Sequence, residues 1–275
     1  MTRTWLITGV STGFGRHLAE QLLSAGDRVA GTVRRLDSVA DLVATYRAAF
    51  HVAPLDLTDT ARIRPVVDAA HAHFGRLDVV VSNAGYGLMG AAEELTDEQV
   101  RHQLDTNLLG SIQLIRAALP HLRADGGGRI LQLSSVGGQV AFPGGSLYHA
   151  TKWGIEGFAD ALAPEVAPFG IGVTLVEPGG ARTEFRYGSS VLAPAIDAYA
   201  ASPSARIRQV LEDRTALSLG DPARMAALMI ATVDQTPAPR RLVLGSDAWT
   251  AITGALEKRL EEVREQKSVA FSTDL

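Results

Sequence analysis

The sequence predicts an α/β fold, a doubly wound parallel sheet of about seven strands with helices on both faces. Short apolar runs alternate with amphipathic stretches, and a glycine-rich turn joins the first run to the first amphipathic stretch. Alternation at this spacing is typical of βαβ units, which build parallel sheets covered by helices. No Pro/Ser-rich linker and no internal repeat divides the 275 residues. We therefore expect residues 1–275 to form a single domain.

The expected strands are short runs rich in Val, Ile and Leu, a composition typical of strands that are buried on both faces. They cover residues 4–8, 28–33, 51–55, 77–82, 129–133, 172–176 and 242–244. The expected helices combine apolar and charged residues at helical spacing. They cover residues 16–25, 60–74, 97–122, 148–168, 222–233 and 247–267.

Composition limits the class of protein and its partners. Hydrophobic residues make up 46% and charged residues 20% of the chain, which is the balance of a globular protein with a large core. A net charge of −4 disfavours nucleic acid and anionic membrane surfaces as partners. The absence of cysteine excludes disulfides and thiolate metal sites, and it fits a cytoplasmic protein. No signal-peptide pattern and no run of 18 apolar residues occurs, so we expect neither secretion nor membrane insertion.

A glycine-rich turn, TGVSTGFG, covers residues 8–15 after the first expected strand. Its glycines permit a tight turn and let the backbone approach a pyrophosphate, which the start of the next helix attracts. The alternative is an ordinary glycine turn without a ligand. The residues that we expect to bind a dinucleotide here are Gly9, Ser11, Thr12, Gly13, Phe14 and Gly15.

Two arginines follow the second expected strand. An acidic residue at this place would bind the ribose 2′-hydroxyl of NAD, but the sequence has Arg34 and Arg35. Their guanidinium groups suit the 2′-phosphate of NADP, and Asp37 lies beyond the expected end of the strand. We therefore expect NADP(H) as the preferred cofactor and NAD(H) as the weaker one. A solvated basic pair is the alternative.

Asp56 and Leu57 follow the third expected strand. The Asp56 carboxylate suits the amino group of an adenine, which would place this turn at the adenine end of the cofactor. Thr58 or Asp59 can also cap the following helix, and that role would explain much of the segment structurally.

Small residues follow the fourth expected strand, and one amide lies in the long helix after it. Asn83, Ala84 and Gly85 leave room for a ribose, although a plain exit from the strand explains them nearly as well. Asn107 interrupts a helix that is otherwise rich in Leu, Ile and Ala, and a polar side chain there needs partners. A local backbone bond and a catalytic role remain equal alternatives for it.

The fifth expected strand ends just before Ser135, and the next helix carries Tyr148 and Lys152. Residues four apart share a helix face, so the phenol and the ammonium can approach one substrate atom together. Open α/β sheets bind ligands at the carboxyl ends of strands, where Ser135 lies. The chain has only three lysines, which makes a chance Tyr-x-x-x-Lys pair rare. His149 is turned about 100° from Tyr148 on the helix, so we expect it at the surface.

Taken in order, these motifs resemble those of the classical short-chain dehydrogenase/reductase family, over nearly the full chain. Pro178, Gly179 and Thr183 match the family's loop that contacts nicotinamide. The resemblance implies a Rossmann-type fold and an NADP(H)-dependent oxidoreductase. Such an enzyme interconverts a secondary alcohol and a ketone, or a primary alcohol and an aldehyde, by hydride transfer. The other matching positions are Gly9, Gly13, Gly15, Asp56, Asn83, Ala84, Gly85, Asn107, Ser135, Tyr148 and Lys152.

The resemblance also implies a role for each catalytic residue. Tyr148 would be the general acid in reduction and the base in oxidation, and Ser135 would orient the substrate oxygen. Lys152 would bind the nicotinamide ribose and lower the phenol pKa, as a neighbouring positive charge does. Asn107 would hold a water that links Lys152 to solvent. No metal is needed for this chemistry, and no His/carboxylate cluster suggests one.

Several features bear on substrate and assembly. Residues 185–205 mix apolar, small and proline residues where the family carries a substrate lid, although an ordinary surface excursion has the same composition. Residues 247–267 are expected to form a C-terminal helical extension. Pro164 should kink its helix or mark the last turn. Apolar helices around Asn107 and residues 153–162 predict a homo-oligomer, a dimer or a tetramer.

Two other function classes share parts of this pattern. Epimerases and dehydratases of the extended branch also use Tyr-x-x-x-Lys, but the three residues between Gly9 and Gly13 and the modest length after Lys152 argue against them. A non-catalytic nucleotide sensor would not need all four catalytic groups. We expect an enzyme that acts on a small carbonyl or alcohol substrate.

Overall fold

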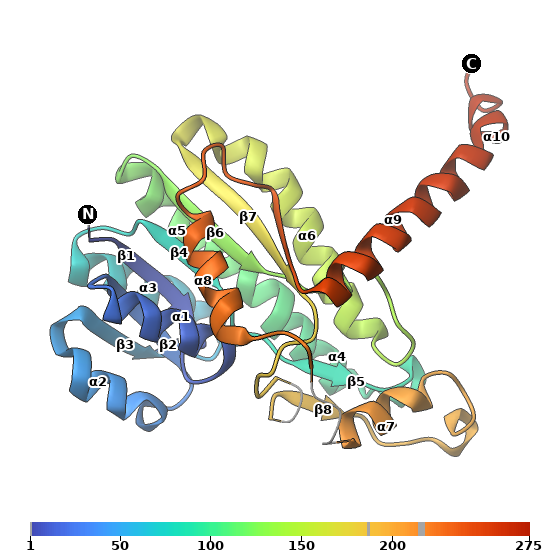
Figure 1. The fold of residues 1–275 in the computed structure, drawn as a ribbon, viewed down its shortest axis with the longest axis horizontal. Coiled ribbons are helices and arrows are strands. Elements are labelled where there is room, and N and C mark those ends of the chain that lie inside the picture. The colour runs from blue at the N-terminus through green and yellow to red at the C-terminus, as the bar shows by residue number, and fades with distance from the viewer. Residues whose placement is uncertain (1, 186–187, 214–217) are drawn as a thin grey trace.

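A seven-stranded parallel sheet runs through the computed structural model, which describes residues 2–185, 188–213 and 218–275. Its order is β3-β2-β1-β4-β6-β7-β9, so the chain changes direction across the sheet between β1 and β4 (Figure 1). This is the doubly wound arrangement that the sequence predicts, and the prediction is confirmed. The strands are β1 (Thr4–Thr8), β2 (Arg28–Val33), β3 (Phe50–Pro54), β4 (Val79–Ser82), β6 (Gly128–Leu133), β7 (Ile171–Pro178) and β9 (Arg241–Leu244).

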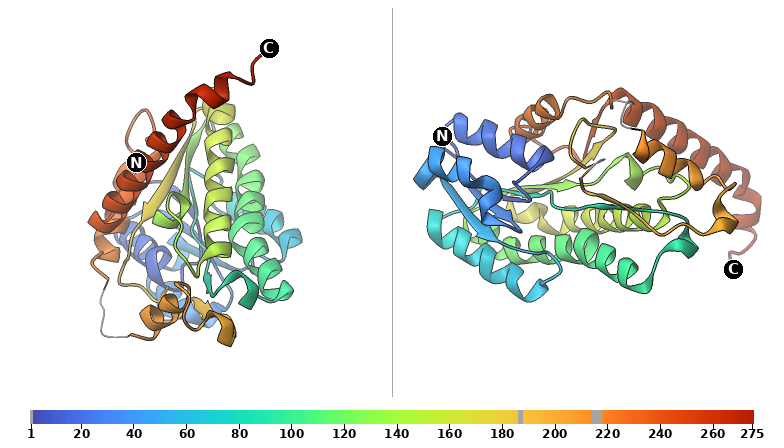
Figure 2. Two further views of the ribbon diagram at one scale, coloured as in Figure 1. Left: turned by 90° about the vertical axis from the view of Figure 1, so that its right-hand side faces the viewer. Right: turned by 90° about the horizontal axis from the view of Figure 1, so that it is seen from below.

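Helices cover both faces of the sheet (Figure 2). On one face α3 (Thr60–Phe74), α5 (Gly110–Ala124) and α6 (Ser146–Val166) form a core with Leu6 of β1. On the other face α1 (Gly13–Ser24) and α8 (Pro222–Thr232) form a core with Trp5 and Ile7. Successive side chains of a strand point to opposite faces, so one apolar strand serves both cores.

Several helix ends follow from local sequence signals. Gly75 ends α3 in a left-handed conformation with φ of 78°, and its N–H donates to His71 O at 2.7 Å. Asp221 caps α8 by accepting from Ala223 N at 2.9 Å. At the start of α3 the expected cap is only partly right. Asp59 occupies the N-cap position, but its side chain makes no capping bond.

The structure departs from the helix expected over residues 97–122. Residues 97–122 are not one regular helix, because a π-helical segment (Asp105–Leu109) separates α4 (Asp97–Leu104) from α5. Pro164 lies in the last turn of α6, which ends at Val166, so it marks the last turn as expected. Some elements, α7 and α10 below among them, were not expected from the sequence. Further ones are α2 (Ala40–Tyr46) and the two strands of a small parallel sheet, β5 (Gly87–Met89) and β8 (Ser190–Leu192).

The C-terminal part of the chain adds α7 (Ala205–Glu212), α9 (Ser246–Glu265) and α10 (Lys267–Phe271). Figure 1 shows α9 running outward beyond the sheet, with α10 at its far end. α9 covers most of residues 247–267, where we expect a C-terminal helix. Within the described ranges, no helix is both long and apolar enough to cross a membrane.

Candidate active site

The segments that the sequence singles out converge at one edge of the sheet. All seven strands are parallel, so their carboxyl ends lie on the same side. Across the sheet, from β3 to β7, these ends lead into Asp56, Arg34, Gly9, Asn83, Ser135 and Gly179. The sheet topology therefore brings together residues that are more than a hundred positions apart in the chain.

Ser135 and Tyr148 form the centre of this edge. Ser135 begins a short 3-10 turn (Val136–Gly138) after β6, and its Oγ accepts a hydrogen bond from Gly137 N at 3.0 Å. Tyr148 lies in the first turn of α6, is 7% exposed, and hydrogen-bonds the Ser135 side chain. The two hydroxyls are thus placed to hold one oxygen atom of a substrate between them.

Burial dominates the ionisation of Tyr148. It raises the pKa of the phenol to about 12, although the hydrogen bond with Ser135 lowers it. The direction differs from the lowering that we expected from Lys152, because loss of hydration is the stronger influence. At neutral pH the phenol is therefore protonated, which is the form that donates a proton.

Lys152 lies one helical turn after Tyr148 and is 8% exposed. Its Nζ donates to the carbonyl oxygen of Leu133 at 3.0 Å and lies 5.8 Å from the centre of the Tyr148 ring. Burial lowers the pKa of Lys152 to about 8, and the charge of Glu156 acts in the opposite direction. The ammonium is therefore close enough to its titration range for small changes in local charge to matter.

Asn107 lies in the π-helical segment and supports the loop after β4. Its Nδ2 donates to Tyr86 O at 2.8 Å, and its Oδ1 accepts from Tyr86 N at 3.0 Å. The same Nδ2 lies 3.4 Å from Thr151 Oγ1, next to Lys152 on α6. The bonds reach a residue 21 positions away, so the side chain ties β4 to α6 across the site.

His149 is buried, so the expectation of a surface position is wrong. It is 7% exposed, its Nδ1 lies 2.9 Å from Gly137 O, and its Nε2 accepts from Phe142 N at 3.0 Å. Burial lowers its pKa against the effect of these two hydrogen bonds. The error has a simple cause, because the first turns of α6 are covered by the Ser135 loop as well as by the sheet. His149 holds that loop against the helix.

The glycine-rich turn is built for close approach of backbone segments. Gly9 and Gly13 have φ of 73° and 56°, which favour glycine. A Cβ on Gly15 would lie 2.2 Å from the carbonyl oxygen of Gly9. The expected Ser11, Thr12 and Phe14 lie in or beside the first turn of α1, and these three side chains are exposed or half-buried.

Thr8 locks the loop after β4 to this turn. Its Oγ1 accepts from Asn83 N and from Ala84 N, each at 3.0 Å, and Asn83 Nδ2 donates to Thr8 O at 2.8 Å. A Cβ on Gly9 would lie 3.1 Å from Ala84 Cβ, and one on Gly85 would lie 3.1 Å from Asn107 Oδ1. Small residues are therefore required here by packing.

The basic pair and Asp56 lie at the β2 and β3 ends of the edge. Arg34 and Arg35 are exposed, and Arg35 Nε binds Asp37 Oδ1 at 3.1 Å. Burial opposes ionisation of Asp56, but hydrogen bonds from Thr58 and the charges of Arg34 and His102 keep its pKa below the usual value. The buried Leu57 side chain packs toward Gly110 of α5, where an added Cβ would meet it at 2.7 Å.

The loop after β7 closes the other side of the glycine-rich turn. Pro178 ends β7, and Gly179 N donates to Leu244 O at 2.8 Å. Thr183 lies next to Gly13, because a Cβ on Gly13 would be 3.7 Å from Thr183 Cβ. The glycine-rich turn and the loop after β7, which we expect at opposite sides of the cofactor, thus border the same space.

The segment after this loop lies over the site. Phe185 reaches Tyr148, with 6.0 Å between ring centres. Beyond it, β8 pairs with β5, and the buried Glu94 accepts from Ile196 N at 3.1 Å and from Arg208 Nη2 at 2.7 Å. The expected lid, residues 185–205, is therefore anchored to the loops after β4. Residues 186 and 187 of it lie outside the described residues.

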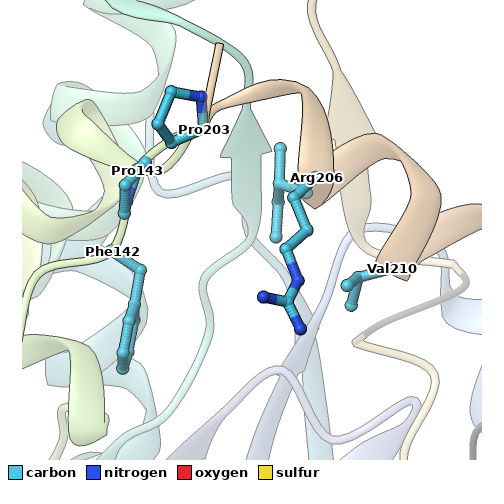
Figure 3. A pocket seen from close by; sticks show the side chains of 6 residues that line it. Phe142, Pro143, Pro203, Arg206 and Val210 are labelled. Atoms are coloured by element: carbon cyan, nitrogen blue, oxygen red, sulfur yellow. The ribbon is translucent and has the colours of Figure 1, made fainter. Parts of the chain in front are cut away.

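A pocket of about 520 Å³ lies between α7 and the loop before α6 (Figure 3). Its walls are mostly apolar, with one guanidinium group. A Cβ on Gly144 would lie 2.6 Å from Ile207 Cγ2, so helix and loop are in direct contact there. The lining residues are Phe142, Pro143, Pro203, Arg206, Ile207 and Val210.

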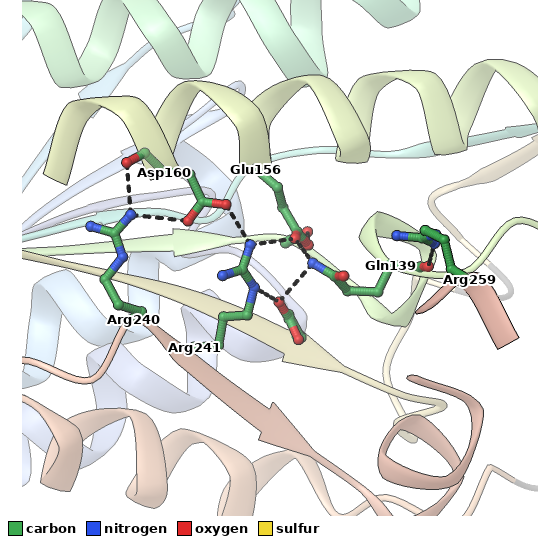
Figure 4. A network of polar contacts seen from close by, with 8 residues as sticks. Gln139, Glu156, Asp160, Arg240, Arg241 and Arg259 are labelled. Atoms are coloured by element: carbon green, nitrogen blue, oxygen red, sulfur yellow. Dashed lines mark hydrogen bonds and ion pairs between the residues drawn. The ribbon is translucent and has the colours of Figure 1, made fainter. Parts of the chain in front are cut away.

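A buried carboxylate cluster behind the site was not found from the sequence (Figure 4). Ser134 Oγ, next to Ser135, donates to Glu156 Oε1 at 2.6 Å, and Arg241 Nε lies 2.9 Å from Glu177 Oε1. The only signal in the sequence is the spacing of Glu156 four residues after Lys152, which places both on one helix face.

The residues at the sheet edge fit a dinucleotide. The glycine-rich turn opens the 12-residue helix α1, whose start attracts phosphate. On one side lie Asp56 and the two arginines, suited to adenine and a 2′-phosphate; on the other lie Lys152 and the loop after β7. The order of these groups is that of the adenine and nicotinamide ends of a dinucleotide laid across the strand ends.

Comparisons with known proteins agree with this arrangement. The family model described as short chain dehydrogenase matches residues 3–190. The protein named Oxidoreductase BOA17 of Botryotinia fuckeliana (strain B05.10) is 38% identical over 251 residues, which is 90% of each chain. The crystal structure of a short-chain dehydrogenase from Streptomyces avermitilis is 41% identical, with a TM-score of 0.91 over 99% of this chain and 98% of that one. The closed form of serine dehydrogenase complexed with NADP+ is 25% identical, with a TM-score of 0.71 over 88% and 93%.

The matched segment runs from before β1 to the start of β8, and it includes every expected catalytic residue. The likeness to BOA17 and to the Streptomyces structure extends well beyond that segment. The chain belongs to the short-chain dehydrogenase family, and it is an oxidoreductase.

Proposed function

We propose that the protein interconverts a secondary alcohol and a ketone, or a primary alcohol and an aldehyde, with NADP(H) as cofactor and Tyr148 as acid/base. One observation carries the proposal: the buried Tyr148 hydroxyl bonds Ser135 while the Lys152 ammonium lies 5.8 Å from the phenol ring. Bound NADP(H) supplies or accepts the hydride. The chain's own groups hold the substrate oxygen and move its proton.

The reaction divides among the residues as follows. Ser135 and Tyr148 both bond the substrate oxygen, which fixes the carbonyl relative to the sheet edge. In reduction Tyr148 gives its proton to that oxygen, and in oxidation it takes the proton back. Lys152 stabilises the phenolate that forms, since an opposite charge nearby favours the ionised form. Asn107 positions the Tyr86 loop and holds the water that links Lys152 to solvent.

NADP(H) is the proposed cofactor in preference to NAD(H). Arg34 and Arg35 lie at the end of β2, where a carboxylate would otherwise select the 2′-hydroxyl of NAD. The complex of the related serine dehydrogenase with NADP+ supports this choice. The residues proposed to contact the cofactor are Gly9, Ser11, Thr12, Gly13, Phe14, Gly15, Arg34, Arg35, Asp56, Leu57, Asn83, Ala84, Gly85, Tyr148, Lys152, Pro178, Gly179 and Thr183.

Residues 185–205 and α7 are proposed to cover the substrate. Phe185 lies against Tyr148, and we propose that the mostly apolar pocket beside Phe142 extends the site. Water exclusion by such walls favours hydride transfer. We therefore propose an elongated, largely apolar ketone or alcohol as substrate.

Two alternatives are less well supported. A nucleotide sensor would have no use for the buried Tyr148 hydroxyl, whose burial costs hydration free energy. An extended-branch epimerase or dehydratase would need a longer substrate-binding region after Lys152.

A homodimer or homotetramer in the cytoplasm remains part of the proposal, and light scattering that returned only the 29.1 kDa monomer would contradict it.

The test is a Tyr148→Phe variant, which keeps the ring and removes the hydroxyl. A screen of NADPH oxidation with ketosteroids, retinoids, quinones, sugars and aliphatic ketones first identifies a substrate. We expect turnover to fall by ~10²–10⁴-fold, the range for a lost general acid, while NADPH binding persists. In the oxidation direction the wild-type rate should rise with pH as the phenol ionises. Near-wild-type turnover by the variant would remove Tyr148 from the mechanism.

A further inference from the structure

Two buried glutamates, Glu156 and Glu177, share one network of polar contacts, and Figure 4 shows the part of it around Glu156. Glu156 of α6 is 3% exposed and Glu177 of β7 is fully buried. The side-chain amide of Gln139 lies between them, because its Nε2 donates to Glu156 Oε2 and lies 3.5 Å from Glu177 Oε1. The pair is therefore one unit joined by a shared donor.

One guanidinium contacts both carboxylates of this pair. Arg241 of β9 is the guanidinium that faces both: its Nη2 lies 3.4 Å from Glu156 Oε2 and its Nε 2.9 Å from Glu177 Oε1. The same Arg241 also binds Asp160 at 2.6 Å, and Arg240 binds Asp160 at 3.0 Å. Much of the available positive charge is thus taken by a third, half-exposed carboxylate.

The surroundings of the Glu177 carboxylate determine whether it carries a proton. Its Oε2 is buried and has no hydrogen-bond partner among the described residues. Burial and the charge of Glu156 raise the pKa of Glu177 to about 7, although Arg241 and Gln139 act in the other direction. The surroundings of Glu177 therefore favour its protonated form up to about neutral pH.

The pair is also connected to the site. Glu156 follows Lys152 by one helical turn, and its charge favours the protonated lysine. Its Oε1 accepts from Ser134, the residue before Ser135, at 2.6 Å. Gly138 of the Ser135 loop has no room for a side chain, since a Cβ there would lie 2.0 Å from Glu156 Oε1. On the far side Arg259 of α9 donates to Gln139 O at 2.9 Å.

We propose that Glu156 is a positioning residue whose buried charge keeps the Lys152 ammonium protonated and fixes the Ser134–Ser135 turn. Glu177 holds the proton that allows this charge to stay buried. The inference rests on the proposed function in that Lys152 acts on Tyr148. When the pair loses its proton at higher pH, the negative charge behind Lys152 increases, and Lys152 stays charged over a wider pH range.

The experiment measures the pKa of Lys152 directly. The chain has three lysines, so ¹³C labelling at the lysine ε-carbon gives three NMR signals. Lys258 and Lys267 are exposed, serve as internal references, and are assigned by Lys→Arg variants. We expect the pKa of Lys152 to fall by roughly one unit in Glu156→Gln, the size of one nearby charge at an effective dielectric constant of about 20.

Asp160→Asn is the matched control. Asp160 lies one further turn along α6 and shares Arg241, but it is half-exposed and makes no contact with the Ser135 turn. The Lys152 titration should be the same in this variant as in the wild type. A role of Glu156 that was only structural would leave the Lys152 pKa unmoved in Glu156→Gln, and that result would overturn the proposal.

Glu177→Gln provides an independent measurement if Glu156→Gln does not fold. In the wild type, the Lys152 signal should show a second inflection as the pair loses its proton, and Glu177→Gln should abolish it. Its absence from the wild type, or its persistence in the variant, would overturn the proposal. None of these titrations needs turnover, so they separate this inference from the proposed function, which Tyr148→Phe tests by activity.

Discussion

Lys152 and Tyr148 share one face of α6, and the ammonium lies 5.8 Å from the centre of the phenol ring. Its hydrogen bond to Leu133 O, at 3.0 Å, fixes it at the end of β6. The position serves two purposes in the proposed mechanism: it places a positive charge beside the acid/base group, and it presents a donor toward the space in front of the sheet edge.

We therefore expect Lys152→Ala to impair both turnover and cofactor binding. Loss of the charge leaves the phenolate without a partner, and loss of the donor weakens the contact with the nicotinamide ribose. Turnover should fall by at least ~10²-fold, as for other acid/base assemblies. Steady-state kinetics and fluorescence titration with NADPH measure the two effects separately. Lys258→Ala, on the exposed surface of α9, is the control and should behave as wild type.

Charge reversal at Arg34 should reduce the preference for NADP(H). A charge-assisted bond to phosphate contributes ~1.5–3 kcal/mol, so the ratio of kcat/KM for NADPH over NADH should fall by roughly 10- to 100-fold in Arg34→Glu. Arg264→Glu makes the same change of net charge on exposed α9 and should leave the ratio unchanged. Equal efficiency of the unmodified enzyme with both cofactors would contradict the assignment of the basic pair.

Filling the pocket beside Phe142 should exclude long substrates and leave short ones accepted. Ile207→Trp adds bulk where α7 faces the loop before α6. We expect kcat/KM for long aliphatic ketones to fall by about 10-fold or more, while short ketones are nearly unaffected, since each lost apolar contact costs ~1–3 kcal/mol. Leu228→Trp adds comparable bulk to the exposed surface of α8 and is the control. A uniform loss across all chain lengths would argue against substrate binding in this pocket.

Glu177 should make stability depend on pH in a defined direction. Its pKa is raised to about 7 in the folded chain from an ordinary value of 4.5, so the folded state binds the proton more tightly. The stabilisation is complete below pH 4.5 and is lost as pH rises through 7. Relative to the wild type, Glu177→Gln should therefore gain stability between pH 5 and 8, measured by thermal unfolding at each pH. Parallel curves for the two proteins would contradict a shared buried proton.

Much of the fold was predictable because the apolar runs are short, regular and separated by strong helix patterns. β1 and β2 have the expected bounds, and the other strands of the large sheet differ by one or two residues at their ends. The small β5–β8 sheet was not predictable, since three-residue strands carry too little periodicity and are held by distant contacts such as Glu94 with Arg208.

The parts of the site in which a motif directly follows a strand were predictable. The parts that depend on contacts between residues far apart in the sequence were not. Ser135, Tyr148 and Lys152 come together as expected. The position of His149 could not be read from its helix face alone, because the loop that covers it is set by Gly137 and Phe142. The pairing of Glu156 with Glu177 depends on α6 crossing β7, which no local spacing reveals.

The π-helical segment, Asp105–Leu109, offsets the two halves of the long helix. A π turn holds one residue more than an α turn, and each residue turns the helix by about 100°. The first half can thus direct Gln103 to Tyr86 O at 2.9 Å, while the second keeps Leu114 and Ile115 against the sheet. In a helix without the extra residue, the Gln103 contact with Tyr86 and the packing of Leu114 and Ile115 against the sheet could not both form. The extra residue acts as a phase shift between a polar half that serves the ligand side and an apolar half that serves the core.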